Sequence, residues 1–183
     1  SNTAYNTNFF DFGNGSPSNN IELQRGNETD DLILYVYRGG SSKSLKAVKA
    51  ITLNTWQYFS VTITPSGLAT IYKNGIQIAQ SQGNNPAFIP NNVDRYTNYV
   101  GGSHWSQDKL FQGQMADLSV WNRAISADDV RSAYTSGLQG NENGLVQLYR
   151  LGNLQSGGNN GTFGYYLNAV SYTHLTLPTK RIV

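Results

Sequence analysis

The chain of 183 residues contains no cysteine. Disulfide bonds, thiol nucleophiles and thiolate metal ligands are therefore excluded. Histidine occurs only twice, which leaves little material for a zinc site or for imidazole-based catalysis. Charged residues make up only 13% of the chain, and no apolar run approaches the length of a membrane span. Glycine is abundant, with 19 copies, as expected of a turn-rich β protein.

A hairpin pattern occupies the middle of the chain. Residues 56–63 and 69–78 alternate apolar and polar side chains, the period of a half-buried strand. Asn74-Gly75 divides the second stretch and suits a type I′ turn, because both central residues of that turn need positive φ. The phasing of these strands also predicts core or sheet-face positions for Trp56 and Trp121.

One short helix is predicted near residues 127–135. Ser126 and Asp129 form a capping-box pattern, with Asp in place of the more usual Glu. Ile125 and Val130 take the two hydrophobic-staple positions, and Gly137 is placed to end the helix. A single helix after many strands predicts an all-β fold with antiparallel sheets.

The order of these motifs resembles a known family. The chain runs from Phe10-Asp-Phe-Gly-Asn-Gly15 through Tyr72-Lys-Asn-Gly75 to Phe111-x-Gly-x-Met-x-Asp-Leu-x-Val-Trp-Asn-Arg-Ala-Ile-Ser126. In that order and spacing it resembles the laminin G-like domains of the concanavalin A-like jelly-roll class. The resemblance implies an antiparallel two-sheet sandwich, in secreted or cell-surface bacterial proteins.

Three segments are expected along the chain. Residues 1–151 form the laminin G-like domain, and the resemblance implies that a further strand precedes them. Residues 152–168 are a linker or the start of a following module, so that 144–168 either closes this domain or opens another, with the closing strand slightly favoured. Residues 169–183 resemble a translated sequencing adapter and are interpreted as a non-native tail, against the alternative of one more short strand.

The charge balance changes if that tail is set aside. Without Lys180 and Arg181, 11 basic residues face 11 acidic residues, so the remainder is formally neutral. The one basic cluster, Lys43, Lys46 and Lys49, is typical of a solvated sheet edge. A nucleic-acid partner is not expected, because a protein that binds nucleic acid needs a concentrated basic face.

Catalysis is not expected either. A related β-glucanase pattern, Glu-x-Asp-x-x-Glu, places its carboxylates along one strand. The nearest match here has Glu28 and Asp30 but Ile33 at the position of the acid/base residue. Outside the tail, His104 is the only histidine, and no nucleophile-elbow motif accompanies it.

The loop around Trp105 is the best candidate for a ligand contact. Sugars are bound by aromatic faces together with amides and carboxylates, and such groups gather on loops of a rigid scaffold. The alternative is that Trp105 folds back over the core edge and that His104 is an ordinary loop residue. The predicted ligand-binding residues are Tyr96, Asn98, His104, Trp105, Gln107 and Asp108.

Asp117 is the candidate for a metal ligand. The resemblance implies that related jelly rolls hold a structural Ca²⁺ with an Asp on this strand and nearby carbonyl oxygens. Calcium prefers such oxygen ligands. The alternative is an outward-facing Asp that hydrogen-bonds the neighbouring loop.

These observations predict a non-catalytic recognition module of a larger secreted or cell-surface protein. Its partner would be a glycan or a cell-surface or matrix protein, with no insertion into a membrane. Two alternatives stay open: a spacer repeat of an adhesin without its own ligand, and an accessory domain of a glycoside hydrolase.

Overall fold

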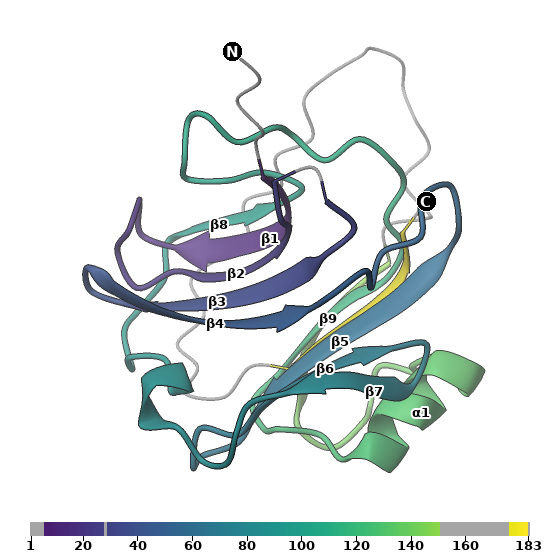
Figure 1. The fold of residues 1–183 in the computed structure, drawn as a ribbon. Coiled ribbons are helices and arrows are strands. Elements are labelled where there is room, and N and C mark those ends of the chain that lie inside the picture. The colour runs from purple at the N-terminus through teal and green to yellow at the C-terminus, as the bar shows by residue number, and fades with distance from the viewer. Residues whose placement is uncertain (1–5, 28, 151–175, 183) are drawn as a thin grey trace. The chain divides into compact units, whose positions relative to one another are not determined.

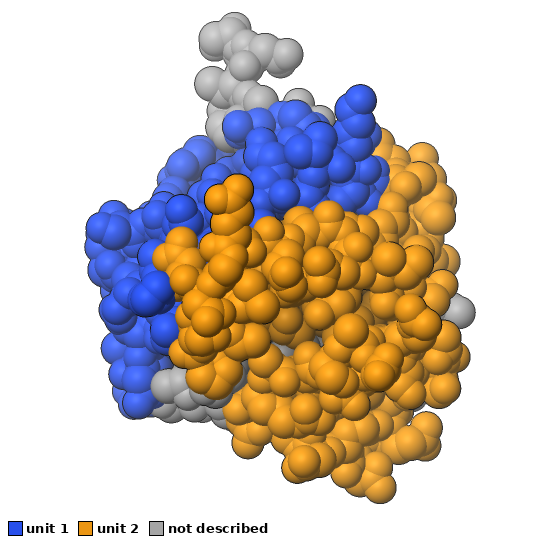
Figure 2. All heavy atoms as spheres, turned by 60° about the horizontal axis from the view of Figure 1, so that its bottom comes forward, with its two compact units in different colours: residues 1–51, 86–112, 162–173 blue, residues 52–85, 113–161, 174–183 orange. Residues whose placement is uncertain are grey.

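The computed structural model describes residues 6–27, 29–150 and, for the backbone, 176–182. Its strands form two antiparallel sheets, and two compact units can be distinguished, one for each sheet (Figures 1 and 2). Unit 1 comprises residues 1–51, 86–112 and 162–173, and unit 2 comprises 52–85, 113–161 and 174–183. The predicted all-β class with antiparallel sheets is confirmed. Within the described residues, no helix is long and apolar enough to cross a membrane.

Unit 1 contains a five-stranded sheet in the order β4-β3-β2-β1-β8, of which the first four strands can be followed in Figure 1. Its strands are β1 (Thr7–Gly13), β2 (Ile21–Arg25), β3 (Leu32–Arg38), β4 (Ser41–Ala47) and β8 (Thr97–Val100). A short 3-10 helix, η1 (Pro86–Phe88), packs against β3 and β4.

The side chains of this sheet divide by alternation into two faces. One face is apolar and fully buried, and its residues include Phe10, Phe12, Ile21, Leu23, Leu32, Leu34 and Val36. The opposite face of β1 and β2 carries Asp11, Glu22 and Gln24, and these polar side chains are buried as well. Burial of polar groups costs free energy unless they are paired, so this second face needs a network of partners.

Unit 2 contains a six-stranded sheet in the order β10-β9-β11-β5-β6-β7. Its strands are β5 (Gln57–Ile63), β6 (Ala69–Lys73), β7 (Ile76–Gln80), β9 (Leu118–Trp121), β10 (Leu145–Tyr149) and β11 (Thr176–Ile182), and its helix is α1 (Ala127–Ser136). β10 pairs with β9, but residues 151–168 lie outside the described residues, so both the linker predicted for 152–168 and the question whether 144–168 closes this domain or opens another stay predictions.

The predicted hairpin and its turn are confirmed. Asn74 has φ 51° and Gly75 has φ 79°, as a type I′ turn requires. A Cβ on Gly75 would lie 3.2 Å from the Cα of Arg131 in α1, so the turn also needs glycine for close approach. The half-buried character predicted for the first strand is wrong, because all seven residues of β5 are buried.

The predicted helix and its capping box are confirmed as well. The Ser126 side chain accepts a hydrogen bond from the Asp129 backbone N–H, and the Asp129 carboxylate accepts one from the Ser126 N–H. Ile125 and Val130 are buried in one apolar cluster, as the staple positions predict. The other buried members of that cluster are Tyr58, Tyr72, Trp121 and Ala133.

The structure differs from the sequence-based prediction for Trp56 and from part of that for the C-terminal tail. Trp121 is buried, but Trp56 lies just before β5 and is 38% exposed, so the core or sheet-face position predicted for it is wrong. Residues 176–182 of the tail form β11 between β9 and β5, as the alternative of one more strand expected. Residues 169–175 and 183 lie outside the described residues, and the foreign origin of the tail stays a prediction.

Candidate functional site

Strand register in unit 1 builds a row of polar and aromatic residues across the sheet. Asp11 of β1 lies opposite Glu22 of β2 and opposite Tyr99 of β8. Glu22 lies opposite Tyr35 of β3. Directly opposed residues share one face of a sheet, so two carboxyl groups are neighbours, with a tyrosine on each flank. This face is the polar face that needs partners.

The loop that follows β8 supplies some of those partners. Gly101, with φ 74°, turns the chain at the end of the strand, and its N–H donates to the Phe9 carbonyl at 2.9 Å. The Phe111 N–H donates to the Gly101 carbonyl at 2.9 Å and closes the loop at its base. The loop therefore carries residues 102–110 on an anchored frame, beside the polar face.

Asp11 receives three hydrogen bonds. Its Oδ2 accepts from the His104 backbone N–H and lies 2.8 Å from His104 Nδ1, while its Oδ1 accepts from Asn20 Nδ2 at 2.7 Å. The other ring nitrogen, Nε2, lies 2.8 Å from Thr97 Oγ1. The side chains of His104 and Asp11 are 6% and 0% exposed, so the imidazole is fixed at both nitrogens and almost closed to solvent.

Glu22 differs sharply from Asp11. It is 2% exposed, and its Oε1 has no hydrogen-bond partner among the described residues. Burial, followed by the negative charges of Asp11 and Asp108, raises the pKa of Glu22 to about 9. Glu22 is therefore a neutral carboxylic acid at pH 7.

Asp108 completes the acidic group from the loop side. Burial raises the pKa of Asp108, and the charge of Asp11 acts in the same direction. A hydrogen bond from Ser103 Oγ at 2.7 Å opposes this shift by stabilising the carboxylate. The charges of Asp11 and Asp108 thus both act on Glu22, and the charge of Asp11 also acts on Asp108.

Three aromatic rings lie next to this network, and we call them the aromatic platform: Tyr35, Tyr37 and Trp105. The rings of Tyr35 and Tyr37 are stacked with centroids 6.0 Å apart, because residues i and i+2 of β3 share a face. The Trp105 ring lies 5.2 Å from that of Tyr37. All three side chains are partly exposed, so the platform combines fixed ring positions with access to solvent.

The structure brings only some of the predicted ligand-binding residues together. His104, Trp105 and Asp108 share the loop beside the polar face, and Gln107 is exposed on the same loop. Tyr96 is 64% exposed, and its hydroxyl donates to Asp94 at 3.0 Å. Asn98 is 3% exposed, and its amide donates to the Arg95 carbonyl at 2.8 Å, so it serves the protein interior.

Sequence reasoning missed Asp11, Glu22, Tyr35 and Tyr37. Two local signals point to three of them: Asp11 interrupts the phenylalanines Phe9, Phe10 and Phe12, and the two tyrosines are spaced by two residues. Of the glucanase-like pattern, Glu28 lies outside the described residues. Asp30 forms an ion pair with Arg25 at 3.3 Å.

Asp117, in unit 2, has a competing partner. It lies just before β9 with φ 55°, and its Oδ2 is 3.4 Å from Arg150 Nη1. The positive charge of this guanidinium disfavours the binding of a metal cation to the same carboxylate, because like charges repel. The described part of the chain also holds no group of three His, Cys, Asp or Glu side chains placed to bind a metal ion. The fit to calcium is therefore poor, and calcium binding stays a prediction.

Comparison with known families shows which family this chain matches. A laminin G family model, described as the concanavalin A-like lectin/glucanases superfamily, matches residues 1–131. No curated protein and no solved structure matches the chain. The matched residues include the whole of the candidate site, from Asp11 to Asp108.

Proposed function

The chain belongs to the concanavalin A-like lectin/glucanases superfamily, and from this premise we propose that it is a non-catalytic module that binds glycans. The observation that carries the proposal is the aromatic platform in unit 1. Tyr37 and Trp105 present partly exposed rings with centroids 5.2 Å apart. Flat aromatic faces stack on the C–H bonds of sugar rings, and neighbouring polar groups bind the hydroxyls.

The position of the carboxyl groups supports binding rather than hydrolysis. Glycoside hydrolases place an acid and an ionised carboxylate on either side of the scissile bond, within reach of substrate and water. Here Asp11 is 0% exposed and already accepts bonds from His104 and Asn20. Glu22 is 2% exposed and neutral at pH 7. Both groups lie beneath the surface to which a sugar chain would bind.

The contacts of His104 also support a structural role. Asp11, His104 and Thr97 follow the acid–imidazole–hydroxyl order of a hydrolase triad. However, Thr97 Oγ1 lies in strand β8 and is also 3.1 Å from the Gly13 carbonyl oxygen. We propose that the contacts of His104 with Asp11 and Thr97 hold the loop that carries Trp105 in place. No hydrolysis of esters or polysaccharides is therefore expected.

The proposal includes an extracellular or cell-surface location within a larger protein. It is supported by the family. In this setting the partner is a glycan on a cell or in a matrix.

A glycan array tests the binding function. We expect Trp105→Ala to weaken binding of the glycan recognised by the wild-type protein by about tenfold or more, equivalent to about 1.4 kcal/mol. Trp56→Ala is the matched control, because it removes a partly exposed tryptophan from unit 2. Equal loss in both variants would contradict the proposed site. Absence of any glycan binding by the wild-type protein would favour the spacer role, and release of sugars from a polysaccharide would favour an enzyme.

A further inference from the structure

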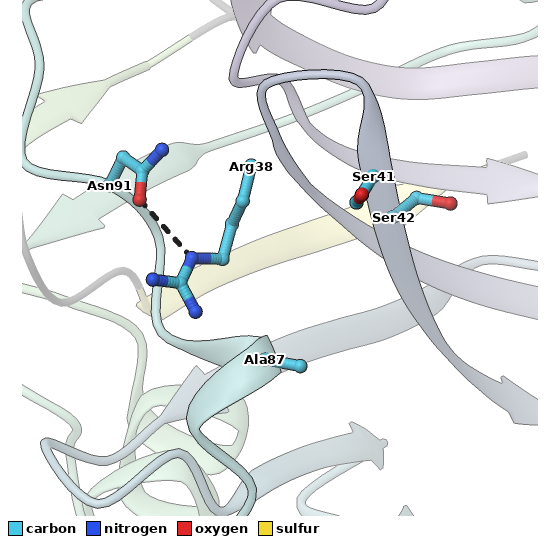
Figure 3. Close-up of a pocket in the computed structure, with 5 residues that line it drawn as sticks. All are labelled: Arg38, Ser41, Ser42, Ala87 and Asn91. Atoms are coloured by element: carbon cyan, nitrogen blue, oxygen red, sulfur yellow. Dashed lines mark hydrogen bonds between the residues drawn. The ribbon is translucent and has the colours of Figure 1, made fainter.

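An open hollow of about 360 Å³ lies at the end of the β3–β4 hairpin in unit 1. Arg38 from β3, Ser41 and Ser42 from β4, Ala87 from η1 and Asn91 line it. Figure 3 shows the Arg38 side chain reaching toward Asn91, with the two serines on the hairpin and Ala87 on the short helix. Among these lining residues, Arg38 offers a cation and Ser41, which lies opposite Arg38, offers a hydroxyl, and none of the five is a carboxylate.

Two bonds within the protein hold the Arg38 guanidinium in place. Nε donates to Asn91 Oδ1 at 3.1 Å, and Nη1 donates to the Pro86 carbonyl at 3.0 Å. For Nη2, the described residues offer no acceptor within hydrogen-bond distance. A guanidinium that is fixed on one side and open on the other is suited to charge-assisted binding of an anion.

The surroundings of the hollow carry positive charge without a carboxylate in contact. Arg95 is 3% exposed, and it donates to backbone carbonyls, including that of Asn91 at 3.2 Å. Burial lowers the pKa of Arg95 to about 10, so its guanidinium stays charged at pH 7. The nearest acidic residue in sequence, Asp94, accepts a bond from Tyr96 instead. Two arginines therefore meet at Asn91, and among the described residues neither forms an ion pair with a carboxylate.

Asn19 makes this arrangement rigid. Its Oδ1 accepts from Asn91 Nδ2 at 2.8 Å and from the Gly39 N–H at 3.0 Å. Its carbonyl accepts from Arg95 Nε at 2.9 Å. One residue thus joins the hairpin tip, the Asn91 loop and the buried arginine. A site fixed before binding loses less entropy when the ligand arrives.

We propose that this hollow binds the carboxylate or sulfate group of an acidic glycan, with Arg38 Nη2 and the Ser41 hydroxyl as donors. The inference rests on the proposed glycan-binding function and names the class of glycan. The hollow and the aromatic platform adjoin each other, because Tyr37 lies opposite Ser42, and Arg38 opposite Ser41.

The hairpin turn leaves room for one sugar chain to contact both places. Tyr37 and Arg38 point to opposite faces of β3, so a chain stacked on Tyr37 must pass over the hairpin end to reach Arg38. That end is Gly39-Gly40, and a Cβ on either residue would meet open space. The two turn residues therefore place no side chain of their own between the two faces.

Calorimetric titration of the full chain tests the inference with three probes: an oligogalacturonate, a sulfated galactan oligomer and a neutral galactan oligomer, at constant ionic strength. We expect at least one acidic oligomer to bind about tenfold more tightly than the neutral one, and Arg38→Gln to remove that preference. Lys46→Gln is the control, because it removes the same charge from β4 at a residue that pairs with Asp31. Circular dichroism establishes that each variant is folded.

The outcomes separate this inference from the proposed function. Equal binding of acidic and neutral oligomers, or a preference that survives Arg38→Gln, would overturn the anion site and leave glycan binding intact. If no oligomer binds, the glycan array decides the proposed function, and inorganic sulfate tests the hollow alone. Sulfate should raise the melting temperature of the wild-type protein more than that of Arg38→Gln; equal shifts would overturn the site. The two acidic oligomers distinguish carboxylate from sulfate.

Discussion

Replacement of Glu22 by glutamine should change how the stability of the protein depends on pH. The folded protein holds the pKa of Glu22 at about 9, against a usual value of 4.5. In the unfolded chain Glu22 ionises above about pH 4.5, whereas in the folded state it must stay protonated or be buried as an anion. The folded state is therefore penalised as the pH rises from 4.5 toward 9.

The size of this penalty follows from the two pKa values. Each pH unit inside the window costs about 1.4 kcal/mol for one proton. Between pH 5 and pH 7 the wild-type protein should lose about 2.5 kcal/mol of unfolding free energy through Glu22 alone. Glu22→Gln has a neutral side chain of similar shape at every pH, so it removes this loss. Asp108, whose pKa is also raised, contributes in the same direction in both proteins.

Urea unfolding at pH 5, 6, 7 and 8 measures the effect. The difference in unfolding free energy between Glu22→Gln and wild type should shift by about 2.5 kcal/mol in favour of the variant from pH 5 to pH 7. An unpaired amide hydrogen would lower the stability of the variant by about 1 kcal/mol at all pH values, without changing this slope. If the unfolding free energy changes with pH in the same way in both proteins, the inference that Glu22 is a neutral, buried carboxyl group is refuted.

Two further predictions concern unit 2. Ser126→Ala should lower the unfolding free energy by about 1 kcal/mol, because the Asp129 N–H loses its side-chain acceptor; an unchanged urea midpoint would contradict the capping role. If Asp117 binds calcium, millimolar CaCl₂ should raise the melting temperature of the wild-type protein but not of Asp117→Asn. If calcium leaves the melting temperature of the wild-type protein unchanged, the calcium site is contradicted, and Asp117 remains the ion-pair partner of Arg150.

Local patterns predicted the elements of unit 2 well. The Asn74-Gly75 turn and the Ser126 cap depend on interactions within a few residues, so the sequence alone carries the information. Trp56 shows the limit of strand phasing, because β5 begins one residue later and leaves this side chain partly exposed. The complete burial of β5 depends on neighbours that its own alternation does not reveal.

The candidate site was less predictable, because it depends on strand register and on long loops. Asp11 meets Glu22 only through the pairing of β1 with β2, and it meets His104 across 93 positions of sequence. Arg38 meets Asn91 across 53 positions. The loop with Trp105 was recognised from its composition, whereas the side chains beneath it became apparent only once the sheet was known.

The way in which the loop from Gly101 to Phe111 is anchored makes it a candidate for protein engineering. Its base is held by main-chain atoms: Gly101 to Phe9, Phe111 to Gly101, and Lys109 to Asn6. Substitution of side chains between these anchor points leaves those bonds available. A library randomised at positions 106 and 107 could therefore select new sugar specificities while the framework remains unchanged, much as antibodies vary their hypervariable loops.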